Sequence, residues 1–211
     1  SLMGPHVIIP TEAARRWASC ASVVKVMGGT GLGAEHLIGA ISPRAITIYR
    51  HWWPEDIQAN LIYSSDGPER AVADIVAGLG RYVHLVDYVE LLNETHQRLE
   101  WGLADHLTFV QKTTKLLHAR GLKVSGFSLG WGAYEWDDIT FLAQNNFGGA
   151  DAFSIHEYWD VDSSPIPDHN YEMVFAAADA AGVPRPLMFL TEIGRGVFDS
   201  PWEGWRAEGV P

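Results

Sequence analysis

The sequence is poor in cysteine, in basic residues and in long apolar runs, and each shortage excludes a class of protein. It contains one cysteine, Cys20, and a single thiol can form neither an internal disulfide nor a cysteine-based metal cluster. Because Cys20 lies in an apolar-periodic stretch, we expect it to be a buried structural thiol. The histidines show no ligand spacing around a carboxylate, so we expect no metal site either.

The charge balance and the short apolar runs narrow the choice of partners. Lysine and arginine number 15 against 26 aspartates and glutamates, which gives a formal net charge of −11. Binding to phosphates requires clustered basic side chains, so we expect no nucleic-acid partner. No apolar run approaches the roughly 18 residues of a membrane span, and no signal peptide is recognisable at the N-terminus, so we expect no membrane partner. Localisation stays open between the cytoplasm and secretion with a leader removed.

The sequence does contain a regular alternation of short β-rich apolar runs and segments with helical spacing. This alternation is typical of parallel α/β proteins. We expect seven strands, at His6–Ile9, Val23–Met27, Ala45–Trp52, Tyr88–Asn93, Lys123–Leu129, Ala152–Tyr158 and Leu187–Glu192. We expect helices between them at Thr11–Ala21, Pro68–Val83, Leu103–Arg120, Asp138–Asn146 and Tyr171–Ala181, with room for a further short helix before Pro68.

Polar and aromatic residues at the strand ends distinguish a barrel from a doubly wound sheet, because functional groups in a barrel gather at the carboxyl ends of several strands. Such residues end most of the expected strands, and we therefore predict one domain over residues 1–211 with a TIM (β/α)8-type barrel fold. A full barrel needs about 250 residues, and the last βα unit is not recognisable. We expect a C-terminal truncation, with closure by another chain as the alternative, and self-association through the incomplete barrel edge.

Two glutamates stand directly after apolar runs, at Glu94 and Glu192. Hydrolysis of a glycosidic bond needs a carboxylic acid that protonates the leaving oxygen and a carboxylate that captures the oxocarbenium-like centre. A carboxyl group at the tip of a buried strand is partly desolvated, a setting that tunes its pKa for acid or base chemistry. The two glutamates are therefore candidate catalytic residues.

The sequence Asn93-Glu94 after the fourth strand, Glu192 at the end of the seventh and the His156-x-Tyr158 motif on the sixth resemble the clan A glycoside hydrolases, a group of β/α-barrel enzymes. The resemblance implies a retaining glycosidase that cleaves β-linked oligo- or polysaccharides without a cofactor. It implies that Glu94 is the acid/base, that Glu192 is the nucleophile, and that Asn93 binds the sugar. Retention predicts carboxyl groups about 5 Å apart.

Further substrate-binding residues are expected around the same opening, and His156 and Tyr158 of the sixth strand are among them. Arg50 and His51 end the third strand, and Trp131 and Trp159 stand near turn residues, where indole rings can stack on the apolar faces of sugars. Five other tryptophans also stand near turn residues, and each could either stack on a sugar or be a partly buried anchor of its loop: Trp52, Trp53, Trp136, Trp202 and Trp205.

Several alternatives stay open at this stage. Glu94 could start a helix, Glu192 could be a surface carboxylate, and His156 could be a structural histidine. The run from Gly29 to Ala34 satisfies a dinucleotide fingerprint, but Gly39 and Pro43 interrupt the helix that should follow, so we interpret the glycines as a turn on the barrel rim. A non-catalytic carbohydrate-binding barrel is the alternative function.

Overall fold

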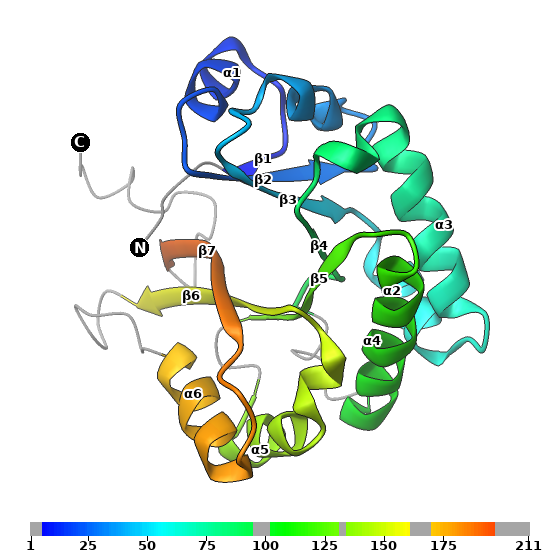
Figure 1. Cartoon of the computed structure of the whole chain (residues 1–211), viewed down its shortest axis with the longest axis vertical. Helices are drawn as coiled ribbons and strands as arrows, with labels where there is room; N and C mark the ends of the chain where they lie inside the picture. Colours follow the sequence, from blue (N-terminus) through cyan, green and yellow to red (C-terminus); the bar gives the residue numbers. More distant parts are fainter. Residues whose placement is uncertain (1–5, 95–101, 131–133, 161–169, 197–211) are drawn as a thin grey trace.

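A computed structural model describes residues 6–94, 102–130, 134–160 and 170–196. Seven parallel strands form one sheet in the order of the sequence, and the sheet curls into a half-barrel with the helices on its outer side (Figure 1). All seven expected strands are present: β1 His6–Val7, β2 Val23–Gly28, β3 Ile46–His51, β4 Tyr88–Glu90, β5 Lys123–Leu129, β6 Ala152–Asp160 and β7 Leu187–Gly196. Among the described residues, β7 pairs with β6 alone.

The helices follow the expected segments, with shifts at their ends. They are α1 Glu12–Ala18, α2 Glu55–Tyr63, α3 Gly67–Leu79, α4 Leu103–His118, α5 Trp136–Gln144 and α6 Asn170–Ala181, with the 3-10 helices η1 Ala34–Ala40, η2 Gly80–Leu85 and η4 Asn146–Gly149. The Thr11 hydroxyl accepts a hydrogen bond from the Ala14 N–H and so caps α1. Gly121, with a φ of 76°, follows the end of α4.

Two apolar clusters define the core. The larger lies between the outer face of the sheet and the helices, and includes Val26, Val89, Phe127 and Phe153. The smaller consists of residues on the other face of the strands: Val23, Ile46, Ile48, Tyr88, Ala152 and Phe189. Because side chains alternate along a strand, the next inward layer toward the strand carboxyl ends holds polar residues: Lys25, Arg50, Glu90, Ser125, Ser154 and His156.

Irregularities in three strands determine which residues reach this polar layer. The β4 ladder ends at Glu90 rather than at the expected Asn93, because the backbone turns at Leu92, which has a φ of 56°. In β5 the register shifts between Gly126 and Leu129. A second shift opposite the step from Ile155 to His156 adds one residue to β7. Such bulges re-aim side chains and are common beside functional sites.

The expectation for Cys20 is wrong, because this residue is exposed. Helix α1 ends at Ala18, earlier than the apolar pattern suggests, and its buried residue is Ala18. Cys20 therefore lies beyond the helix in a turn, where it no longer follows the helical periodicity.

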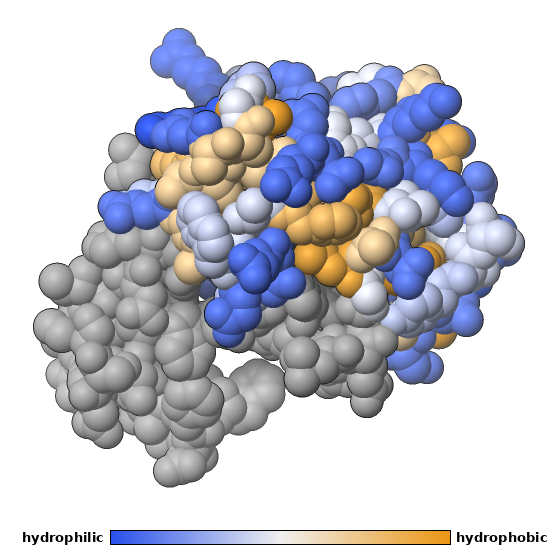
Figure 2. Space-filling model, turned by 90° about the horizontal axis from the view of Figure 1, so that it is seen from below, coloured by the Kyte–Doolittle hydropathy of each residue, from blue (hydrophilic) through white to orange (hydrophobic). Residues whose placement is uncertain are grey.

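The outer surface is mixed in character. On the face seen from below, hydrophilic residues surround a central region of hydrophobic ones (Figure 2). No helix in the described part of the chain has the length and apolar character needed to cross a membrane.

Candidate active site

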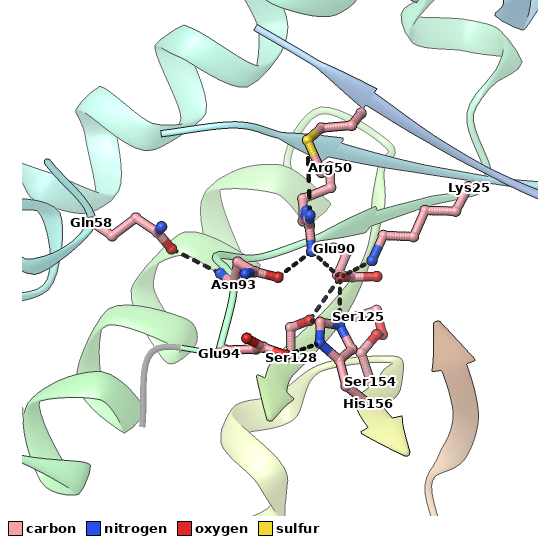
Figure 3. A network of polar contacts seen from close by, with 11 residues as sticks. Lys25, Arg50, Gln58, Glu90, Asn93, Glu94, Ser125, Ser128, Ser154 and His156 are labelled. Carbon is pink, nitrogen blue, oxygen red and sulfur yellow. Dashed lines mark hydrogen bonds and ion pairs between the residues drawn. The ribbon is translucent and has the colours of Figure 1, made fainter. Parts of the chain in front are cut away.

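Glu90 is the centre of a buried ionic cluster at the carboxyl ends of the strands (Figure 3). Its side chain is fully buried, and its Oε1 accepts a hydrogen bond from Lys25 Nζ of β2 at 2.8 Å. Arg50 Nη1 of β3 lies 3.5 Å from the same oxygen, and Ser128 Oγ of β5 donates to it at 2.7 Å. The carboxylate thus joins three neighbouring elements of the sheet.

The pKa of Glu90 lies well below its ordinary value. Burial raises this pKa, but the nearby charge of Lys25, the hydrogen bond with His156 and the charge of Arg50 together outweigh burial. Glu90 is therefore an anion at neutral pH, and its role in the cluster is that of a fixed negative charge.

Glu94 contacts His156 in the same layer. The Nδ1 atom of His156 lies 2.7 Å from Glu94 Oε1, and its Nε2 atom lies 3.1 Å from Ser128 Oγ. The His156 side chain is fully buried, whereas that of Glu94 is 25% exposed. Glu94 has a φ of 47°, a conformation disfavoured for non-glycine residues, and its N–H donates to the Ser128 carbonyl at 2.7 Å. Backbone and side-chain contacts thus hold this carboxyl group toward the barrel opening.

Glu192 lies beside His156 in the sheet, since these two residues are Cα partners across β6 and β7. The described residues include the backbone of Glu192, Tyr158 and Trp159 but not their side chains. Trp131 falls outside the described residues. The carboxyl separation predicted for Glu94 and Glu192 and the sugar contacts predicted for these aromatic residues therefore stay predictions.

Hydrogen bonds fix both the backbone and the side chain of Asn93. Its N–H donates to Gln58 Oε1 of α2 at 2.8 Å, and Gln58 Nε2 donates to the Trp53 carbonyl at 3.0 Å. Its Oδ1 accepts a hydrogen bond from Arg50. Gln58 is buried, so this amide bridge fixes the loop after β4 against the start of α2.

A cavity of about 370 Å³ opens beside Asn93, a volume within the range of small-ligand pockets, about 300–1,000 Å³. Trp52 is 46% exposed, while Trp53 is buried and donates from Nε1 to Asp74 at 2.9 Å. His51 contacts the Tyr49 hydroxyl and the Trp53 ring, and burial lowers its pKa despite the opposing charges of Asp74 and Glu35. The lining residues are Ile8, Met27, Thr30, Arg50, His51, Trp52, Trp53, Pro54, Glu55, Gln58 and Asn93.

The structure brings five of the predicted site residues to this end of the sheet: Arg50, His51, Asn93, Glu94 and His156. Of these, His51 projects on the strand face opposite to that of Arg50, because the two are neighbours in β3. Sequence reasoning missed Glu90, Ser128 and Gln58. A signal existed for Glu90, because Lys25 and Glu90 are single opposite charges within the apolar runs of β2 and β4.

The glycine-rich run after β2 forms bends in which Gly29 and Gly33 have φ values of 77° and 76°. It leads into the 3-10 helix η1. A dinucleotide fingerprint should open a long α-helix whose N-terminus binds the pyrophosphate, and this segment does not provide one. Among the described residues, no group of three or more His, Cys, Asp or Glu side chains could hold a metal ion.

Comparison with solved structures finds similar folds. An endo-β-1,3-glucanase of glycoside hydrolase family 128, subgroup I, from Amycolatopsis mediterranei, solved in complex with laminaritriose, matches with a TM-score of 0.53 and 14% identity, over 93% of this chain and 73% of that chain. A D-psicose 3-epimerase solved in the presence of D-fructose matches with a TM-score of 0.45 and 10% identity, over 86% of this chain and 65% of that chain.

The similarity to the glucanase shows that the chain shares its β/α-barrel type of fold. No protein-family model matches the sequence, and no curated protein matches it.

Proposed function

We propose that the protein is a retaining glycoside hydrolase that acts on β-linked glucans, with Glu94 as the acid/base and Glu192 as the nucleophile. The observation that carries the proposal is the position of His156. Its side chain contacts Glu94 at 2.7 Å, and its backbone is the ladder partner of Glu192. One residue thus lies next to both glutamates at the carboxyl end of a barrel sheet, which is where barrel enzymes have their active sites.

The proposed reaction has two steps. In the first, a Glu192 carboxylate oxygen bonds to the anomeric carbon while the bond from that carbon to the leaving oxygen breaks, and Glu94 gives its proton to the leaving oxygen. In the second, water attacks the anomeric carbon, Glu94 takes a proton from the water, and Glu192 leaves. The sugar leaves with its original anomeric configuration.

Charges in the site suit this chemistry. Lys25 and Arg50 pair with Glu90 and keep it ionised, so this carboxylate does not compete with Glu94 as the proton donor. Asn93, held by Gln58 and Arg50 beside the cavity, is placed to bind a sugar hydroxyl. The exposed Trp52 ring at the same cavity is a surface on which a sugar ring can stack.

The glucanase with the similar fold was solved in complex with laminaritriose, and this sugar is the reason to test β-1,3-glucan oligosaccharides first. The experiment compares the parent with Glu94→Gln and Glu192→Gln on these oligosaccharides and on aryl β-glucosides. Both substitutions should lower kcat by at least about 100-fold, because each removes a carboxyl group used in bond cleavage. Proton NMR of the first product should show the β-anomer.

Glu69→Gln is the matched control, since Glu69 is an exposed carboxylate in the first turn of α3, and it should keep full activity. Initial release of the α-anomer would contradict the retaining mechanism. Sugar binding by the parent without hydrolysis, unchanged in Glu192→Gln, would favour a carbohydrate-binding barrel.

A further inference from the structure

The hydrogen bonds around His156 determine which of its nitrogens carries a proton. Ser128 has one hydroxyl proton and donates it to Glu90 Oε1 at 2.7 Å. The Ser128 oxygen, 3.1 Å from His156 Nε2, can then act only as an acceptor in that contact. His156 Nε2 must therefore carry a proton.

This assignment leaves Nδ1 facing Glu94 Oε1 at 2.7 Å. A neutral imidazole protonated at Nε2 has a lone pair on Nδ1, and a contact this short needs one proton between the two atoms. That proton lies either on Glu94, which then donates to Nδ1, or on Nδ1, which then donates to the Glu94 carboxylate. The fixed charge of Glu90, itself held by Lys25 and Arg50, supports the Nε2 proton in both cases.

We infer that Glu90 and Ser128 are positioning residues that keep a proton on His156 Nε2, so that His156 and Glu94 share one mobile proton at the contact between Nδ1 and Oε1. The catalytic meaning of this pair rests on the proposed function. When Glu94 gives the proton to the leaving oxygen, the Nδ1 lone pair is left facing a carboxylate. The repulsion between them favours return of a proton from the attacking water in the second step.

Several other ionisable groups that the structure describes lie around the pair. Glu90 and Glu94 approach His156 from β4 and the residues after it, while Lys25 of β2 and Arg50 of β3 act through Glu90. On β7, Glu192 is the register partner of His156. The nearest part of β5 contributes the hydroxyl of Ser128. This group is neutral, so a substitution can remove it without changing the formal charge of the site.

The first test is the nitrogen-15 NMR spectrum of the histidine side chains in the full chain, with the His156 signals assigned by their loss in His156→Gln. We expect Nε2 to be the protonated nitrogen, and Ser128→Ala to shift the population toward the tautomer protonated at Nδ1. Ser128→Thr, which keeps the hydroxyl, should restore the parent spectrum. Ser125→Ala is the matched control, because its hydroxyl lies in the same strand, is equally buried and contacts Ser154 instead. A parent His156 that is neutral with its proton on Nδ1 would overturn the inference.

The second test separates proton donation from folding. Ser128→Ala should lower kcat/KM by at least about 10-fold for β-glucosides with poor leaving groups, which need the acid. For dinitrophenyl β-glucoside, which does not need the acid, the change should stay within about twofold. Equal losses on both substrates would overturn the positioning role. An inactive parent with the expected tautomer would refute the hydrolase proposal and leave the proton sharing standing, so the two failures are distinguishable.

Discussion

Glu90 links three polar side chains in the interior of the half-barrel. It is fully buried, and its Oε1 takes contacts from Lys25, Arg50 and Ser128, whereas its Oε2 has no hydrogen-bond partner among the described residues. Loss of its charge would remove the carboxylate that the buried Lys25 and Arg50 side chains contact. A buried ion pair broken on one side destabilises a protein far more than a surface pair does.

We expect Glu90→Gln to lower the free energy of unfolding by about 3–5 kcal/mol at neutral pH. The parent should also lose stability as the pH falls below the ordinary glutamate value of 4.5. In that range the unfolded chain binds a proton at Glu90 while the folded chain keeps the carboxylate, so protonation favours unfolding. His51, whose pKa is lowered by burial, adds a loss that begins nearer 6.5.

Urea unfolding followed between neutral pH and about pH 3 measures both effects. The acid loss should be smaller in Glu90→Gln than in the parent, and unchanged in Glu69→Gln. An equally steep loss in Glu90→Gln would show that other groups cause it.

The strands and helices were easier to predict from the sequence than the side-chain contacts between them. The seven strands follow from their β-rich apolar runs, and the carboxyl-end rule for barrels indicated Arg50, Asn93, Glu94 and His156. Ser128 could not be found in this way, because it lies three residues after Ser125, and strict alternation would place these two on opposite faces. The shift in β5 that brings both inward begins at Gly126, and a glycine within a strand is a local signal for a bulge. The glycine does not indicate which later residues turn inward, because this depends on pairing with β6.

The position of the loop at Asn93 depends on helix α2, because Gln58 of α2 accepts a hydrogen bond from the Asn93 N–H. The junction of α2 and α3 in turn fixes the end of α2. A Cβ atom at Gly67 would lie 1.8 Å from the Leu61 carbonyl oxygen, so Gly67→Ala must displace one helix. We expect a loss of at least about 1–3 kcal/mol in the free energy of unfolding, and a raised KM if the hydrolase proposal holds. Gly39→Ala is the control, since its nearest neighbour is a Tyr82 ring carbon at 3.3 Å. Equal effects in the two variants, measured by urea unfolding, would contradict this steric account.

The whole chain is acidic, and its described residues form a half-barrel. Its last described strand, β7, pairs on one side with β6 and presents two exposed side chains, Leu187 at 47% and Leu190 at 39%. Exposed strand edges promote association unless charged residues interrupt them. The net charge of −11 opposes association at neutral pH, and this repulsion weakens as the pH approaches the pI of about 5.1.

We therefore predict concentration-dependent self-association that increases with salt, because salt screens the repulsion. Sedimentation velocity should show a smaller associated fraction for Leu190→Lys than for the parent. Trp17→Lys, which changes an exposed apolar residue of α1, should leave that fraction nearly unchanged. Equal effects of the two substitutions would indicate nonspecific association through exposed apolar side chains instead of a contact at the β7 edge.

The register shifts in β5 and β7 determine which residues of these two strands face the site. Side chains on a strand follow a two-residue period, and each shift changes the phase of that period by one residue. The pairing of Ser128 with His156, and of His156 with Glu192, thus depends on the number of residues in β5 and β7 as much as on their identity. Deleting one residue from β5 between Ser125 and Ser128 would turn Ser128 toward the helices while leaving both proposed catalytic glutamates in the sequence. Alignments of related chains should therefore be judged by where their gaps fall within these two strands.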